Sequence, residues 1–238
     1  MENWSAHTLY ERAEAKLGQK VAAGLQLYAT QLNNRRLPVI FTLGHLAKIT
    51  QVDYKFLRDT VDRRRESANY RMFAVKKRSG GRRFIHAVSG KLLAVQQFIN
   101  TEILQQLLPH PCSYAFHPKG GIRKCAAQHC GAKWLFQYDL TDFFYDVTEI
   151  DVYRIFRNLG YRNLLSFELA HLCTTTHLPR HIKVELKCRE DCGLFEENNI
   201  PYKIGGESKY IGVLPQGSPT SPMLSILLTI EFSCFQAA

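Results

Sequence analysis

The chain has 238 residues, of which 45% are hydrophobic, so it can bury a core and is not a disordered chain. Lys and Arg total 31 against 21 Asp and Glu, a formal net charge of +10 that favours a polyanionic partner such as nucleic acid. The seven cysteines are odd in number and irregularly spaced, which predicts reduced thiols in a cytoplasmic protein. No apolar run approaches the ~20 residues that a membrane span needs, so no membrane partner is expected.

Residues 1–62 are expected to form a helical N-terminal region. Apolar residues recur at helical spacing over residues 1–32, and Pro38 separates this stretch from the next apolar segment. From Thr42, which suits a helix N-cap, the pattern predicts two short helices with a loose look of a helix-turn-helix. Any two packed helices joined by a polar turn give the same pattern, so it does not by itself indicate DNA recognition.

Residues 63–132 are expected to combine a basic β-hairpin with a long helix. The side chains alternate over residues 70–77, a glycine-rich turn comes next, and extended character resumes, which predicts a hairpin over residues 70–87. Basic and aromatic side chains are interleaved along this stretch: Arg63, Arg64, Arg65, Tyr70, Phe73, Lys76, Lys77, Arg78, Arg82, Arg83 and Phe84. Ser89 then precedes an apolar run at helical spacing, which predicts a helix that ends before Pro109.

Residues 133–238 are expected to form a unit of mixed strands and helices. The apolar run 134–138 predicts a buried strand that ends at Asp139. Thr148, with Asp151 three positions later, predicts a helix with a capping box, and another helix is predicted over residues 164–173. A C-terminal helix is predicted to have Ser221 as its cap and Pro222 in its first turn.

Residues 176–210 are rich in charged and turn-forming residues, and we interpret them as an insertion with a hairpin around residues 205–207. Four potential ligands with H-x3-H and C-x3-C spacing suggest a structural zinc site as an alternative: His177, His181, Cys188 and Cys192. Tighter cysteine pairs are more typical of zinc sites, and a chain this rich in His and Cys gives such spacings by chance. Coincidence is therefore the preferred interpretation.

Two segments carry residues suited to nucleotide chemistry. Carboxylates such as Asp139, at the end of a strand, hold divalent cations in two-metal phosphoryl transfer. Asp142 fits the same chemistry, a solvated turn or a helix cap. The loop over residues 212–222 contains three prolines and Gly217, and it presents Gln216 rigidly. A carboxamide both donates and accepts hydrogen bonds, which suits the sugar and base edge of a nucleotide.

Together, the segment 138–144 (YDLTDFF) and the loop 214–222 (LPQGSPTSP) resemble those of bacterial retron-type reverse transcriptases, which are related to group II intron enzymes. The resemblance covers roughly residues 40–232 and implies an α+β fold, with the fingers and a partial palm of a right-hand polymerase and no thumb. On this basis residues 63–132 correspond to the fingers and residues 133–238 to the partial palm. The implied activity is RNA-directed DNA synthesis.

The resemblance also implies roles in the palm segment. Asp139 is similar to the catalytic metal ligand, and the carbonyl of Leu140 adds a metal contact, for two Mg²⁺ ions in the complete enzyme. The backbone amides near Asp142 and Phe143 are implied to hold the incoming triphosphate. Phe144 looks like the gate that excludes a ribose 2′-hydroxyl and so selects deoxynucleotides.

In the hairpin, Arg83 resembles the arginine that contacts the incoming triphosphate, and Lys76 is a weaker candidate for that role. Gln216 looks like the nucleotide-contacting glutamine of the family. Four residues just before the predicted strand resemble a short retron element: Ala126, His129, Gly131 and Ala132. Four other positions depart from the retron pattern: Val88, Cys125, Ile226 and Ser233.

The largest departure from the family is the absence of its Tyr-x-Asp-Asp motif, because the 238 residues contain no Asp-Asp pair. We therefore expect the chain alone to be inactive and a downstream polypeptide to complete the palm and thumb. The implied partners are an RNA template, an RNA/DNA duplex and a structured non-coding RNA, with a role in phage defence. The alternative is a non-catalytic nucleic-acid-binding protein, either a polymerase remnant or a subunit of a split enzyme.

Overall fold

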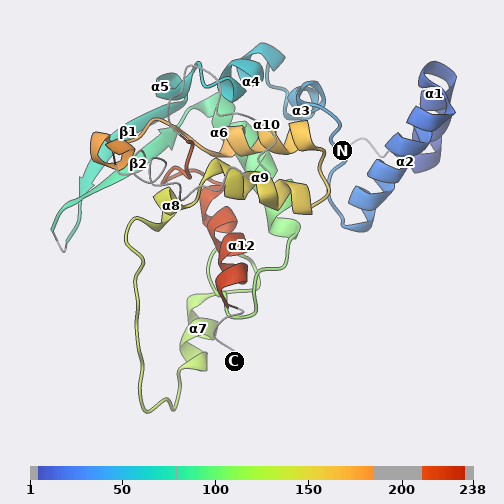
Figure 1. Cartoon of the computed structure of the whole chain (residues 1–238). Helices are drawn as coiled ribbons and strands as arrows, with labels where there is room; N and C mark the ends of the chain where they lie inside the picture. Colours follow the sequence, from blue (N-terminus) through green and yellow to red (C-terminus); the bar gives the residue numbers. More distant parts are fainter. Residues whose placement is uncertain (1–4, 79, 185–210, 234–238) are drawn as a thin grey trace.

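The computed structural model describes residues 5–78, 80–184 and 211–233. The N-terminal region is helical, as predicted, and consists of α1 (Ala6–Leu17) and α2 (Gln19–Asn34). Gly18 separates the two helices with a φ of +82°, a conformation that glycine adopts without strain. The two helices lie against one another at one end of the molecule, opposite the hairpin (Figure 1).

The two predicted short helices are α3 (Leu43–Thr50) and α4 (Tyr54–Val61). Thr42 caps α3 as predicted, since its hydroxyl accepts a hydrogen bond from the amide of His45 at 3.1 Å. Helix α4 packs on the later helix α10 (Asn163–Cys173), where Arg58 pairs with Glu168 at 2.9 Å. A short helix, α5 (Glu66–Asn69), leads into the hairpin.

The predicted hairpin is confirmed as the antiparallel strands β1 (Tyr70–Lys76) and β2 (Arg82–Val88). The register runs from Tyr70 opposite Val88 to Lys76 opposite Arg82. Successive side chains alternate between the two faces of a strand, so the face that carries the buried Tyr70 and His86 also carries Lys76 and Arg82. One face of the hairpin therefore turns to the core, while its far end projects from the molecule (Figure 1).

The core forms where four helical segments meet. They are α6 (Gly90–Phe98), α9 (Glu149–Asn158), α10 and α12 (Ser221–Ser233). Helix α6 continues as a π-turn (Ile99–Ile103) and a 3-10 turn (Leu104–Gln106), so the predicted long helix is present with a looser end. The fully buried side chains at their centre include Leu92, Ile99, Ile103, Leu104, Phe156 and Tyr161. Mixed helix and strand agree with the α+β class.

The predicted cap of α9 is confirmed, whereas that of α12 is not. The capping box of α9 is present, because Thr148 and Asp151 hydrogen-bond reciprocally. The prediction that Ser221 caps α12 is wrong. The helix already includes Ser221, whose hydroxyl donates to the carbonyl of Pro215 at 2.8 Å and so ties the helix to the loop before it. Pro222 occupies the first turn as predicted.

The predicted buried strand over residues 134–138 is wrong. These residues lie on a long excursion that carries α7 (Ile122–Gln128) away from the core (Figure 1), and Trp134, Phe136 and Tyr138 are more than three-quarters exposed. A strand needs a paired neighbour to satisfy its backbone. In the described parts of the chain, strand pairing is confined to the hairpin and to bridges of Val213 with Thr148 and Thr175.

Part of the insertion over residues 176–210 lies outside the described residues, including the hairpin expected at residues 205–207 and the candidate zinc ligands Cys188 and Cys192. His177 and His181 are described. No helix within residues 5–78, 80–184 and 211–233 is both long and apolar enough to cross a membrane.

Candidate nucleotide-binding site

The loop that carries Gln216 is anchored at its start by backbone hydrogen bonds to two distant segments. The amide of Val213 donates to the carbonyl of Thr175 at 3.1 Å, and the amide of Thr175 donates back at 2.9 Å. The amide of Leu214 donates to the carbonyl of Val147 at 3.1 Å, and both loop residues are fully buried. Only near Gln216 does the loop reach the surface, where the glutamine side chain is partly exposed.

The loop is also joined to the basic hairpin. The amide of His86, on β2, donates to the carbonyl of Gln216 at 2.7 Å. Gly217 comes next with a φ of +113°, and a Cβ atom there would lie 2.9 Å from the carbonyl oxygen of His86. The close approach and the positive φ both require glycine at this position. The hairpin and the glutamine loop therefore meet backbone to backbone.

His86 is buried at this junction. Its Nε2 lies 2.9 Å from the carbonyl oxygen of His177, which assigns Nε2 as the donor. Its ring meets those of Tyr70 and Tyr145 edge-on, at centroid distances of 6.2 and 6.4 Å. Burial lowers the pKa of His86 below its ordinary value, so the ring is neutral at pH 7. The junction is thus a packed, uncharged contact between β2 and the segment that comes after Phe144.

The structure places the predicted residues of the palm segment in two separate regions. Asp142 has a φ of +50° and directly precedes α8 (Phe143–Asp146), where the rings of Phe143 and Phe144 are partly buried and lie 6.3 Å apart. Tyr145 of the same helix contacts His86.

The two predicted metal ligands, Asp139 and Leu140, instead lie exposed on the excursion. No hydrogen bond or ion pair among the described residues connects them to the Gln216 loop.

The two basic residues predicted in the hairpin lie on opposite faces. Arg83 pairs with Val75, whereas Lys76 pairs with Arg82 on the face that also carries His86. Arg83 therefore shares the outer face with Phe73, and Lys76 shares the inner face with Arg82. Sequence reasoning passed over Arg82, although the two-residue period of the strand places it on the same face as His86.

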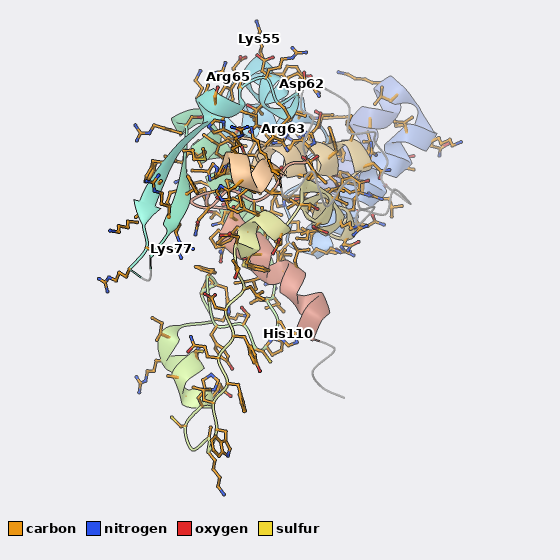
Figure 2. The ribbon with its side chains drawn as sticks, turned by 60° about the vertical axis from the view of Figure 1, so that its left-hand side comes forward. Lys55, Asp62, Arg63, Arg65, Lys77 and His110 are labelled. Carbon is orange, nitrogen blue, oxygen red and sulfur yellow. The ribbon has the colours of Figure 1, made fainter. Side chains whose placement is uncertain are left out.

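A buried cluster of charged groups packs against the start of the Gln216 loop, and it was not predicted from the sequence. Arg63 is 6% exposed, and its guanidinium donates to the carboxylates of Glu66 at 2.9 Å and Glu149 at 2.5 Å. It also donates to the carbonyl of Thr174 at 2.6 Å. Figure 2 shows Arg63 inside the molecule, whereas Lys55 points outward.

Gly212 packs directly on this cluster. A Cβ atom at Gly212 would fall far inside van der Waals contact with both Arg63 and Glu149, and the carbonyl of Gly212 accepts a hydrogen bond from the Glu149 amide at 2.7 Å. Burial opposes the charge of Arg63, but Glu66 and Glu149 raise its pKa above the ordinary value. The cation is therefore permanent, and it fixes the start of the glutamine loop.

His171 borders the same cluster and predicts a pH dependence of stability. Burial, together with the positive charge of Arg63, lowers the pKa of His171 to about 4. His171 therefore binds a proton below about pH 6.5 in the unfolded chain but only near pH 4 in the folded chain. The free energy of unfolding falls as the pH drops from 6.5 to 4. For this one group the loss is about 3 kcal/mol.

The measurement is urea unfolding at pH 7, 6, 5 and 4 of the parent chain and of His171→Gln. We expect the parent to lose stability more steeply, by about 3 kcal/mol over this range, while His86 contributes equally to both proteins. Parallel pH profiles for the two would contradict the assignment to His171.

The two predicted Mg²⁺ ligands are of the type that this ion prefers, but they are too few to hold it. The carboxylate of Asp139 and the carbonyl of Leu140 are hard oxygen ligands of the kind that Mg²⁺ prefers. Within the described ranges, however, no group of three or more His, Cys, Asp or Glu side chains is placed to hold a metal ion. Asp139 and Leu140 would therefore need further oxygen ligands to complete a site.

Comparison with known proteins agrees with the resemblance found in the sequence. The chain is 29% identical over 203 residues to the retron Ec86 reverse transcriptase of Escherichia coli, which covers 83% of this chain and 51% of that protein. It is 32% identical over 209 residues to the retron Mx65 reverse transcriptase of Myxococcus xanthus, covering 84% and 44% of the two chains. The chain is related to the retron-type reverse transcriptases.

The retron Mx162 reverse transcriptase of Myxococcus xanthus is 28% identical over 165 residues. No protein-family model matches the chain. The chain spans about half the length of the first of these retron reverse transcriptases, or less of the others.

Proposed function

We propose that this chain supplies the fingers and the front of the palm of an RNA-directed DNA polymerase of the retron type. The observation that carries the proposal is the hydrogen bond from the His86 amide to the Gln216 carbonyl. It joins a basic hairpin, suited to phosphates, to a rigid loop that presents a carboxamide, suited to a sugar and a base edge. A deoxynucleotide bound between them would meet both groups at once.

The proposed domains are a helical region over residues 1–62, fingers over residues 63–132 and a partial palm over residues 133–238. In this arrangement Gln216 contacts the nucleotide, and the amides near Asp142 and Phe143 hold its triphosphate. Phe144 excludes the ribose 2′-hydroxyl. On the hairpin, Lys76 and Arg82 lie on the face of His86, and Arg83 lies on the opposite face with Ile85, whose side chain adjoins Gly217 of the loop. All three basic residues are proposed to contact phosphates.

Asp139 and the Leu140 carbonyl are proposed as oxygen ligands for Mg²⁺, which when bound would neutralise charge on the attacking and leaving oxygens. The exposed apolar run over residues 134–138 supports a further step of the proposal. An apolar stretch of this kind usually marks a surface that another segment covers. We propose that a segment with the Tyr-x-Asp-Asp motif, which a second polypeptide can supply in the tests below, pairs with this run and adds further carboxylates.

The retron reverse transcriptases are relatives of this chain at about 30% identity. By analogy with them, we propose an RNA template, an RNA/DNA duplex and a structured non-coding RNA as partners, and a role in defence against phage. A non-catalytic nucleic-acid-binding protein is the second candidate function. It is favoured by the net charge of +10 together with the absence of an Asp-Asp pair in the sequence.

Binding of an RNA template annealed to a DNA primer tests the role of the hairpin. We expect the double variant Lys76→Gln/Arg82→Gln to bind roughly tenfold more weakly at about 100 mM salt and to show a smaller dependence of affinity on salt, because phosphate contacts are lost. Fluorescence anisotropy of the labelled duplex over a salt series measures both quantities.

The matched control removes the same charge from the exposed surface of the N-terminal helices, as Arg12→Gln/Lys20→Gln. This control is expected to change the affinity by less than about twofold. Equal weakening by the two double variants would show that net charge, rather than the hairpin, determines binding, and would contradict the proposed fingers.

A further inference from the structure

Gln96 is a fully buried polar residue whose side chain touches three elements of the candidate site. It lies on α6, and its Nε2 donates to the hydroxyl of Tyr70 on β1 at 2.9 Å and to the carbonyl of Leu172 on α10 at 2.8 Å. Its Oε1 accepts a hydrogen bond from the hydroxyl of Ser218 at 2.9 Å. The carboxamide therefore has partners on both of its polar atoms.

The orientation of this carboxamide is fixed by its partners. A backbone carbonyl only accepts hydrogen bonds, so the atom that faces Leu172 must be the nitrogen and the atom that faces Ser218 must be the oxygen. Ser218 is itself held, because its Oγ lies 2.9 Å from the Thr220 hydroxyl and accepts a bond from the Thr220 amide at 3.3 Å. No alternative rotation of the amide satisfies these groups.

Gln96 is connected to the backbone around Gln216 by two separate chains of contacts. On one side, Gln96 holds Ser218, two residues after Gln216. On the other side, it holds Tyr70, whose ring packs edge-on against that of His86, and the His86 amide donates to the Gln216 carbonyl. Two independent routes therefore connect this one side chain to the backbone of Gln216.

We propose that Gln96 is a positioning residue that aligns the Gln216 carboxamide with the basic hairpin and so sets the affinity for the incoming nucleotide. This role rests on the proposed function of Gln216. Gln96 itself is buried and would not touch the nucleotide. Its loss would let the loop and the hairpin separate without removing any group that contacts substrate.

The first test measures the loop directly, without reference to activity. Gln96→Met keeps the length of the side chain and removes all three hydrogen bonds. In amide hydrogen exchange followed by NMR, we expect the His86 amide to exchange roughly tenfold faster in this variant, which corresponds to the loss of about one net hydrogen bond. The buried Val152 amide, which donates to the Thr148 carbonyl at 3.1 Å in the first turn of α9, reports global opening and is expected to change by less than about twofold.

Gln97→Met, an exposed neighbour on the same helix, is the matched control and is expected to leave both amides unchanged. Ser218→Ala removes the bond from Gln96 to the loop, together with the contacts between Ser218 and Thr220, and leaves the bonds of Gln96 to Tyr70 and Leu172 in place. It serves if Gln96→Met fails to fold; the His86 amide should again exchange faster. Equal acceleration at His86 and Val152, or none at His86, would overturn the proposal in favour of a purely structural residue.

The second test links the loop to the nucleotide. In primer extension by the complemented enzyme, Gln96→Met should raise the KM for the deoxynucleotide roughly tenfold with kcat within about threefold. A fall in kcat at constant KM would overturn the nucleotide role. Absence of extension by every variant, including the parent, would instead contradict the proposed function, while hydrogen exchange would still decide whether Gln96 positions the loop.

Discussion

Replacement of Arg63 by methionine is expected to lower the free energy of unfolding by about 3–5 kcal/mol. The guanidinium is almost wholly buried and pairs with Glu66 and Glu149, so its removal leaves two carboxylates without their cation. It also frees the carbonyl of Thr174 from a 2.6 Å hydrogen bond. Urea unfolding at pH 7, monitored by circular dichroism, measures the change.

The adjacent Arg64 provides the control, because it is 62% exposed and its pairs with Asp59 and Asp62 lie on the surface at 3.5 and 3.4 Å. Arg64→Met should cost less than about 1 kcal/mol. Similar losses for the two variants would mean that the buried cluster is not the main support of the Gln216 loop. A loss confined to Arg63→Met would agree with the structure.

Asp139→Asn is expected to reduce primer extension by the complemented enzyme at least about 100-fold, because the carboxylate charge contributes several kcal/mol when cations are held for phosphoryl transfer. The side chain is exposed, so the substitution should leave the folded state intact. Binding of the RNA/DNA duplex should change by less than about twofold, since a carboxylate adds nothing to phosphate attraction.

Asp62→Asn is the control for this prediction, because Asp62 is partly exposed, is distant from Asp139 in the sequence, and pairs with the exposed Arg64 at 3.4 Å. It should extend primers like the parent. Equal loss in the two variants, or a loss of duplex binding with Asp139→Asn, would point to a structural rather than a chemical role for Asp139.

The helices and the hairpin could be predicted because their signals are local. Thr42 and Thr148 cap helices through bonds that span three residues, and the alternation of side chains around Tyr70 fixes the strands of the hairpin. The glutamine loop was predicted as a rigid element for the same reason. Its anchoring was not predicted, since Val213 is bonded to segments that are distant in the sequence.

The remaining features depend on contacts that no short pattern encodes. In the sequence, Arg63 is one of the basic residues grouped with the hairpin, yet its side chain is buried between carboxylates that are 3 and 86 residues away. Gln96 lies within the predicted apolar helix, and no local pattern marks its hydrogen bonds to three other segments. The apolar run before Asp139 was predicted as a buried strand because its composition was considered without a pairing partner, and it is exposed in the described structure.

The most direct test of the proposed function is primer extension on an RNA template by this chain, by a second polypeptide carrying a Tyr-x-Asp-Asp motif, and by the two together. We expect extension only by the mixture, and only with Asp139 intact. Extension by this chain alone, or extension by the mixture that survives Asp139→Asn, would contradict the proposal.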